Sequence, residues 1–242
     1  MRVEHPIFLM RLHRRHRFLP AIFSQIVQMT RRRMGTVIFG LDRPTPAVVR
    51  AVDKAVRSAP TRLEFDYVTL PPLQSSEGAA WVDSLQLLHS RMLQIPCADA
   101  GMLLDDDILF TDNALRELED HLADLQLDRV DAQKLHVCDD SFEHHDEGIH
   151  ETYETFLFRV YREDKWTQMN NCPDRVARSP LRTRLDNPVL HFGYINADER
   201  ERCWNAAKLC GQTDAYYRSL AMPPQPVPIT HSCSWLEKIL ER

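Results

Sequence analysis

The sequence lacks the signatures of several common classes of enzyme and binding protein. It has no glycine-rich phosphate-binding loop, no Gly-x-Ser-x-Gly nucleophile motif and no nucleic-acid-binding motif. No window of about twenty apolar residues occurs. The N-terminus shows no signal-peptide pattern of basic start, apolar run and small-residue cleavage site. These absences predict a cytoplasmic protein with no membrane span.

The cysteine pattern and the net charge bear on the compartment of the protein and on its binding partners. The six cysteines form no Cys-x-x-Cys pair, and a chain of 242 residues can bury a core without disulfides. We therefore expect free thiols in a reducing compartment. The net charge of -5 disfavours a protein that coats nucleic acid or anionic membrane by bulk electrostatics.

Strand-like and helix-like patterns alternate over the first half of the chain. The expected strands are residues 6–12, 36–41, 63–68, 101–104 and 130–137, and the expected helices are 19–29, 46–57, 78–94 and 112–125. This alternation predicts an α/β fold whose mostly parallel central sheet is flanked by helices. Right-handed crossovers would place the carboxyl ends of the strands along one edge, where such sheets bind ligands.

The second half is less regular. Residues 138–151 are rich in Asp, Glu and His and are expected to form a loop, which fits either an acceptor-binding loop or a zinc site. Strands are expected at 155–161, at a return beginning near Trp166 and at 189–194. Helices are expected at 198–209 and 214–220, before an extended proline-rich segment at 223–228. No linker divides the chain, so we predict one domain over 1–242.

Three adjacent aspartates carry the strongest chemical signal. Asp105, Asp106 and Asp107 follow the apolar residues Met102, Leu103 and Leu104 directly. Carboxylates one residue apart at the end of a buried strand can converge on one divalent cation, and oxygen ligands suit magnesium or manganese. A solvated acidic turn that caps the next helix is the alternative interpretation.

In this order of elements the chain resembles GT-A glycosyltransferases, above all the inverting family 2. The resemblance covers roughly the first 140 residues. The turn with Arg11, His13 and Arg15 is similar to the turn after that family's opening strand. Asp42 is similar to the aspartate that closes its second strand and faces the nucleotide base. The aspartate triplet is similar to its Asp-x-Asp turn.

The resemblance implies a metal-dependent glycosyltransferase whose residues 1–137 bind a nucleotide sugar and whose residues 138–242 bind the acceptor. The donor would be a nucleoside diphosphate sugar carrying UDP or GDP, with Mn²⁺ or Mg²⁺ as cofactor. The acceptor is open among a glycan, a small molecule, a protein and a modified nucleic-acid base. Nucleotide-binding residues would be Arg11, His13, Arg15, Asp42, Asp105 and Asp106.

Asp105 and Asp107 would bind the metal, and His191 is expected to be its remaining protein ligand. His191 ends an apolar strand before Gly193, which allows close backbone approach. A buried histidine bonded to the backbone is the structural alternative.

The family's Glu-Asp motif for the catalytic base is not evident here. The acidic candidates for that base are therefore Glu151, Glu154 and Asp174. Two other functions stay open: a phosphohydrolase of the haloacid dehalogenase type, and a non-catalytic nucleotide-binding module derived from a transferase.

Overall fold

The protein is described by a computed structural model, and the account below covers the residues whose placement that structure gives. They are 3–12, 17–71, 78–123, 128–138, 143–145, 153–167, 172–174, 180–192, 226–230 and 232–235, together with 198, 200, 201, 204, 205 and 208.

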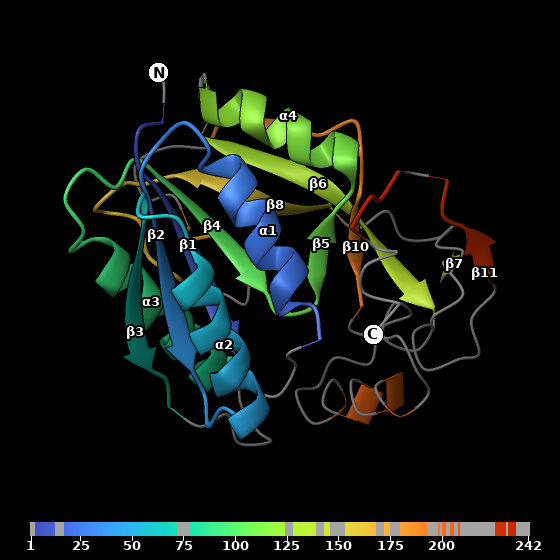
Figure 1. Cartoon of the computed structure of the whole chain (residues 1–242), viewed down its shortest axis with the longest axis horizontal. Helices are drawn as coiled ribbons and strands as arrows, with labels where there is room; N and C mark the ends of the chain where they lie inside the picture. The colour runs from blue at the N-terminus through green and yellow to red at the C-terminus, as the bar shows by residue number, and fades with distance from the viewer. Residues whose placement is uncertain are drawn as a thin grey trace.

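Four parallel strands form one half of the central sheet (Figure 1). They lie in the order β3-β2-β1-β4 and are β1 (Pro6–Leu12), β2 (Gly35–Leu41), β3 (Leu63–Thr69) and β4 (Ala100–Asp105). β1 and β2 are apolar and buried nearly throughout, as expected of strands covered on both faces. The carboxyl ends of all four strands therefore lie along the same edge.

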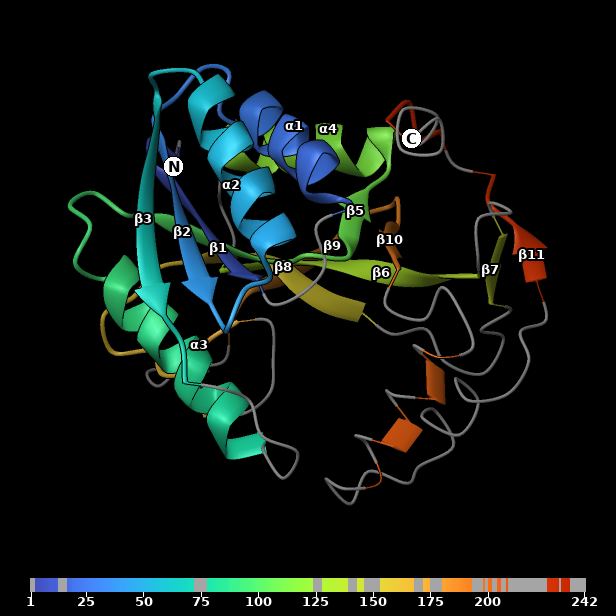
Figure 2. The ribbon, with the colours of Figure 1, turned by 60° about the horizontal axis from the view of Figure 1, so that its bottom comes forward.

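Helices cover both faces of this sheet (Figure 2). One face carries α1 (Leu19–Met29), α2 (Pro46–Ser58) and α4 (Asp112–Ala123), and the other carries α3 (Gly78–Met92). Thr45 begins α2 by accepting a hydrogen bond from the Val48 amide at 3.4 Å. Thr111 caps α4 in the same way, accepting from the Ala114 amide at 3.3 Å.

An antiparallel strand separates the four parallel strands from the mixed part of the sheet around β6. β8 (Tyr153–Arg159) lies between β4 and β6 (Arg129–Cys138) and runs antiparallel to both. The sequence predicted both strands but not this order, because alternation of apolar residues is the same for parallel and antiparallel strands. The predicted fold class is confirmed: an α/β protein with a mostly parallel, helix-flanked sheet.

Short strands complete the sheet around β6, where Figure 1 labels β5, β7, β10 and β11. They are β5 (Ile108–Phe110), β7 (Glu143–His145), β9 (Arg182–Arg184), β10 (Val189–His191) and β11 (Pro226–Pro228). β10 lies between β5 and β6, and β11 pairs with β7. β5, β7 and β9 were not predicted, because three residues are too few to show a period. β10 was predicted as part of the longer apolar run 189–194.

Four further expectations for the second half have different outcomes. Residues expected to form only a loop at 138–151 include β7, and the expected return strand at Trp166 is reduced to an isolated bridge between Lys165 and Asp174. The described residues between 198 and 208 are helical, as predicted, whereas the expected helix at 214–220 lies outside the described residues.

In the described part of the chain, no helix combines the length and apolar character that crossing a membrane requires.

Candidate functional site

Three charged residues meet at the carboxyl edge of the parallel strands. Arg11 near the end of β1 is in register with Asp105 at the end of β4 and with Gly40 in β2. Asp42 follows Gly40 by two residues, and its amide donates to the Leu12 carbonyl at 3.1 Å, so it continues the pairing beyond β2. Because side chains alternate along a strand, Arg11, Asp42 and Asp105 share the face that α3 covers.

Burial and opposite charge both act on Arg11 in this group. The side chain is 8% exposed, and burial lowers the pKa of Arg11 below its ordinary value. The negative charges of Asp105, Asp42 and Asp106, in decreasing order, act against that decrease in pKa. Asp42 is itself 1% exposed. The edge therefore holds one buried guanidinium beside one buried carboxylate, that of Asp42, and two half-buried ones.

The chain leaves Asp42 through an unusual backbone conformation. Arg43 has a φ of 45°, in the left-handed region, and stands directly before Pro44. Such a conformation costs a non-glycine residue about 1–2 kcal/mol, and its presence at a sheet edge is typical of a turn that positions a functional group.

The aspartate triplet divides its members between two neighbourhoods. Asp105 is the last residue of β4 and faces Arg11, whereas Asp107 precedes β5 and lies beside β10. The Phe192 amide donates to the Asp107 carbonyl at 2.8 Å. The Nε2 atom of His191 lies 3.6 Å from the Oδ2 atom of Asp107, and both residues are at least 90% buried. Of the three expected metal ligands, the structure thus brings Asp107 and His191 together and places Asp105 beside Arg11 instead.

The donor set of Asp107 and His191 fits a divalent cation. Two ligands each about 2.1 Å from one cation lie about 3.0–3.6 Å apart at angles from 90° to nearly 120°. The separation of 3.6 Å falls at the upper end of that range. Among the described residues, no group of three or more His, Cys, Asp or Glu side chains is arranged to hold a metal ion. A cation here would therefore need oxygen ligands from a bound molecule to complete its coordination.

A second histidine, which the sequence analysis did not single out, completes this group. His136 in β6 is in register with His191 in β10, and their Nδ1 atoms lie 2.6 Å apart. His136 is fully buried. The signal in the sequence was a lone histidine between Leu135 and Val137, and this pattern by itself more often marks a core residue.

The segments around the aspartate turn are anchored by side chains from distant parts of the chain. Gln25 of α1 donates to the Phe110 carbonyl at 2.9 Å and accepts from the Phe110 amide at 3.2 Å. The indole of Trp235 donates to the same carbonyl at 2.8 Å and packs on Phe192, with ring centres 6.2 Å apart. Phe18 covers Phe192 at 4.4 Å. β5 and the residue after His191 are therefore held from both sides.

Of the candidates for a general base, Glu154 lies on the sheet. It stands near the start of β8, pairs in register with Ala132 of β6 and forms an ion pair with Lys134. β8 runs antiparallel to β4, so its first residues lie toward the edge where β4 ends.

Asp174 lies in a different region from the aspartate turn. Its carboxylate accepts from the amide and hydroxyl of Thr167, and its backbone forms a bridge with Lys165. The neighbouring Pro173 carbonyl accepts from Arg129 at the beginning of β6, seven residues before His136. Glu151, His13 and Arg15 lie outside the described residues.

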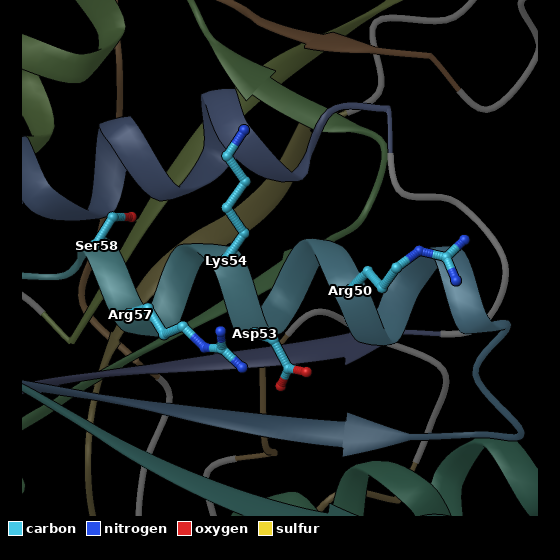
Figure 3. Close-up of a pocket in the computed structure, with 5 residues that line it drawn as sticks. All are labelled: Arg50, Asp53, Lys54, Arg57 and Ser58. Carbon is cyan, nitrogen blue, oxygen red and sulfur yellow. The ribbon is translucent and has the colours of Figure 1, made fainter.

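A surface hollow on α2 is separate from this edge. It is lined by five residues of that one helix, which lie along successive turns in Figure 3: Arg50, Asp53, Lys54, Arg57 and Ser58. α2 covers the opposite face of the sheet from α3, so this hollow does not open onto Arg11 or Asp42. The sequence spacing of these residues is that of a solvated helix face.

Comparisons with known proteins add a distant likeness. No family model and no curated protein matches the chain. Solved structures that resemble it include S. aureus TarS 1–349 in complex with UDP-GlcNAc, at 10% identity and a TM-score of 0.43, with 90% of this chain and 70% of that chain covered. A second structure of S. aureus TarS 1–349 gives 10% identity and a TM-score of 0.42, with 90% and 69% covered. A likeness at this level carries no argument about activity.

Proposed function

We propose that the protein is a metal-dependent glycosyltransferase that moves a sugar from a nucleoside diphosphate sugar to an acceptor. The observation that carries this proposal is the convergence of charged groups at one sheet edge. Arg11, Asp42 and Asp105 meet where β1, β2 and β4 end. Asp107 faces His191 on the adjoining strands. Open α/β sheets bind nucleotides at this kind of edge.

In this proposal, each group has a role set by its charge and position. Asp42 accepts hydrogen bonds from the base or ribose, and Arg11 holds Asp42 and Asp105 in place. Asp106, half-buried on the turn, faces the same nucleotide. Asp107 and His191 would hold Mn²⁺ or Mg²⁺. Such a cation, when bound, neutralises the charge that develops on a leaving diphosphate.

The acceptor hydroxyl needs a base if the transfer inverts the anomeric centre. We propose Glu154 for this role, because β8 places it toward the carboxyl edge of β4.

Free thiols at Cys97 and Cys172 favour a reducing compartment, in keeping with a cytoplasmic location.

The phosphohydrolase alternative requires a different placement of its aspartates. Enzymes of that type carry their aspartate pair at the end of the first strand. β1 ends at Arg11 and Leu12, and the three residues that follow are His13, Arg14 and Arg15. The aspartates of this chain instead follow β4.

The proposal predicts that nucleotide and metal bind cooperatively. Because Asp107 and His191 supply only two ligands, Mn²⁺ alone or UDP or GDP alone should shift the melting temperature little. Nucleotide at about 100 times its Kd together with Mn²⁺ should raise it by about 5–10 °C. The Asp107→Ala variant should lose this joint effect and remain folded.

The control is Asp120→Ala, which removes an exposed aspartate from the second half of α4, thirteen residues after Asp107. It should keep the full shift in a thermal-melt assay. If nucleotide and Mn²⁺ raise the melting temperature of Asp107→Ala as much as that of the wild type, the assignment of Asp107 as a metal ligand is wrong. Absence of any shift with both nucleotides in the wild type would sink the proposed donor.

A further inference from the structure

The histidine pair at the edge of the sheet has a defined geometry. His136 of β6 and His191 of β10 stand side by side in parallel register, with ring centres 4.7 Å apart and ring planes at 78°. On the other side of β10, His191 is in register with Ile108 of β5, the residue directly after Asp107. Three neighbouring strands therefore fix the side chains of His136, His191 and Asp107 relative to one another.

The contact between the two rings requires one proton and one lone pair. The Nδ1 atoms are 2.6 Å apart, so one of them donates a hydrogen bond to the other. If His191 donates from Nδ1, its Nε2 atom carries a lone pair. If His136 donates instead, a neutral His191 carries its hydrogen on Nε2, directed toward Asp107.

The distance to Asp107 distinguishes these two arrangements. The gap of 3.6 Å between Nε2 of His191 and Oδ2 of Asp107 exceeds the length of an N–H···O hydrogen bond, which is about 2.7–3.2 Å. The second arrangement therefore gains no short hydrogen bond at Asp107. The first arrangement leaves a nitrogen lone pair 3.6 Å from a carboxylate oxygen, and a divalent cation takes both kinds of donor.

We propose that His136 is the positioning residue for His191. It accepts the hydrogen bond from Nδ1 of His191 and so fixes the tautomer in which Nε2 is the ligand beside Asp107. Outer-shell partners of this kind orient a metal-binding imidazole, and their loss typically weakens metal binding about 10- to 100-fold. The inference rests on the proposed function, in which Asp107 and His191 hold the cation.

The first test compares two substitutions at His136. His136→Asn places an amide oxygen near the position of Nδ1 and can still accept, whereas His136→Leu fills similar space without an acceptor. Binding of Mn²⁺ to the UDP-bound protein is measured from the electron paramagnetic resonance signal of free Mn²⁺ at pH 7.5. His136→Leu should bind Mn²⁺ about 10- to 100-fold more weakly, and His136→Asn should stay within about 3-fold of the wild type.

The matched control is His89→Leu. His89 is also fully buried, but it lies on α3 against Trp166, on the face of the sheet opposite α1, α2 and α4. This variant should change the melting temperature and leave Mn²⁺ affinity unchanged. Equal weakening in His89→Leu and His136→Leu would show a general loss of packing and would overturn the role of His136.

A second measurement needs no change at His136. In wild-type protein labelled with ¹⁵N-histidine and bound to Mg²⁺ and UDP, two-bond ¹H–¹⁵N correlations report which ring nitrogen carries the hydrogen. The signals of His191 are identified by their loss in His191→Ala. We expect a protonated Nδ1 and an unprotonated Nε2. A hydrogen on Nε2 of His191, alone or together with one on Nδ1, overturns the inference.

The two proposals fail in different ways. If the wild type binds no Mn²⁺ in the presence of UDP or GDP, the proposed function fails. If the wild type binds Mn²⁺ and His136→Leu binds it equally well, the role of His136 alone is overturned.

Discussion

At the scale of single residues, three aspartates at the same edge of the sheet have different surroundings. Asp105 ends a strand and faces the guanidinium of Arg11. Asp107, two residues later, faces His191 instead. Asp42 reaches Arg11 from a separate strand and is the most buried of the three, at 1% exposure. A buried carboxylate beside a cation is well suited to accept hydrogen bonds from a ligand.

We expect Asp42→Asn to weaken nucleotide binding by about 1–3 kcal/mol, because a neutral amide replaces a charged acceptor. Calorimetric titration with UDP and GDP measures this loss. Titration with Mn²⁺ in the absence of nucleotide should be unchanged, since Asp42 lies apart from Asp107. The control is Asp66→Asn. Asp66 lies on the neighbouring strand β3, and its carboxylate forms an ion pair with Arg91 of α3. An equal loss in both variants would remove Asp42 from the nucleotide site.

At the scale of elements, the insertion of β8 between β4 and β6 determines what surrounds the site. β8 turns the chain back across the sheet, so its first residues approach the edge where β4 ends. Glu154 thereby lies in β8 with Lys134 of β6 as its partner. Asp174 is tied to Thr167 and lies near the beginning of β6. Strand direction, and not proximity in the sequence, separates these two candidates.

If Glu154 is the base, Glu154→Gln should lower kcat by about 100-fold or more, as loss of a general base does. Release of UDP from a UDP-sugar, with water or acceptor, measures this rate. Nucleotide and Mn²⁺ affinity should be unchanged, and glutamine can still accept from Lys134, which keeps the fold intact. Asp174→Asn serves as the comparison and should keep kcat. A normal rate in Glu154→Gln would leave Glu151 as the remaining acidic candidate.

At the scale of the whole molecule, the sheet separates two apolar cores. The larger packs β1, β2 and β4 against α1, α2 and α4, and the smaller packs the opposite face against α3. His89 of α3 lies in the smaller core against Trp166, with ring centres 5.7 Å apart. Burial lowers the pKa of His89 from 6.5 to about 4. The folded protein therefore keeps this imidazole neutral at a pH where the unfolded chain takes up a proton.

This difference makes the stability of the protein depend on pH. Because the folded pKa lies below the unfolded one, the contribution of His89 to the free energy of unfolding is complete above about pH 6.5. It falls by about 3 kcal/mol as the pH drops to about 4. Urea unfolding between pH 4 and 7.5 measures it as the difference between wild type and His89→Leu. Parallel pH curves for the two proteins would contradict the prediction.

The sequence alone determined those helices and strands whose apolar residues recur with a regular period or whose first turn follows a capping residue. The apolar runs of β1, β2 and β4, the helix caps Thr45 and Thr111 and the aspartate triplet are local features. Local spacing decides local conformation, because side chains three or four residues apart meet on a helix and alternate residues share a face of a strand. The fold class and the edge that carries Arg11, Asp42 and Asp105 followed from that order of elements.

The tertiary structure decided which distant residues meet. Three contacts join segments that are more than fifty residues apart in the sequence. They are the pairing of β8 with β4, the insertion of β10 between β5 and β6, and the contact of His136 with His191. The residues that flank a lone histidine in a strand do not reveal whether its neighbour on the next strand is a leucine or a second histidine. Register between strands depends on packing over the whole molecule, and that packing is what placed His136, His191 and Asp107 together.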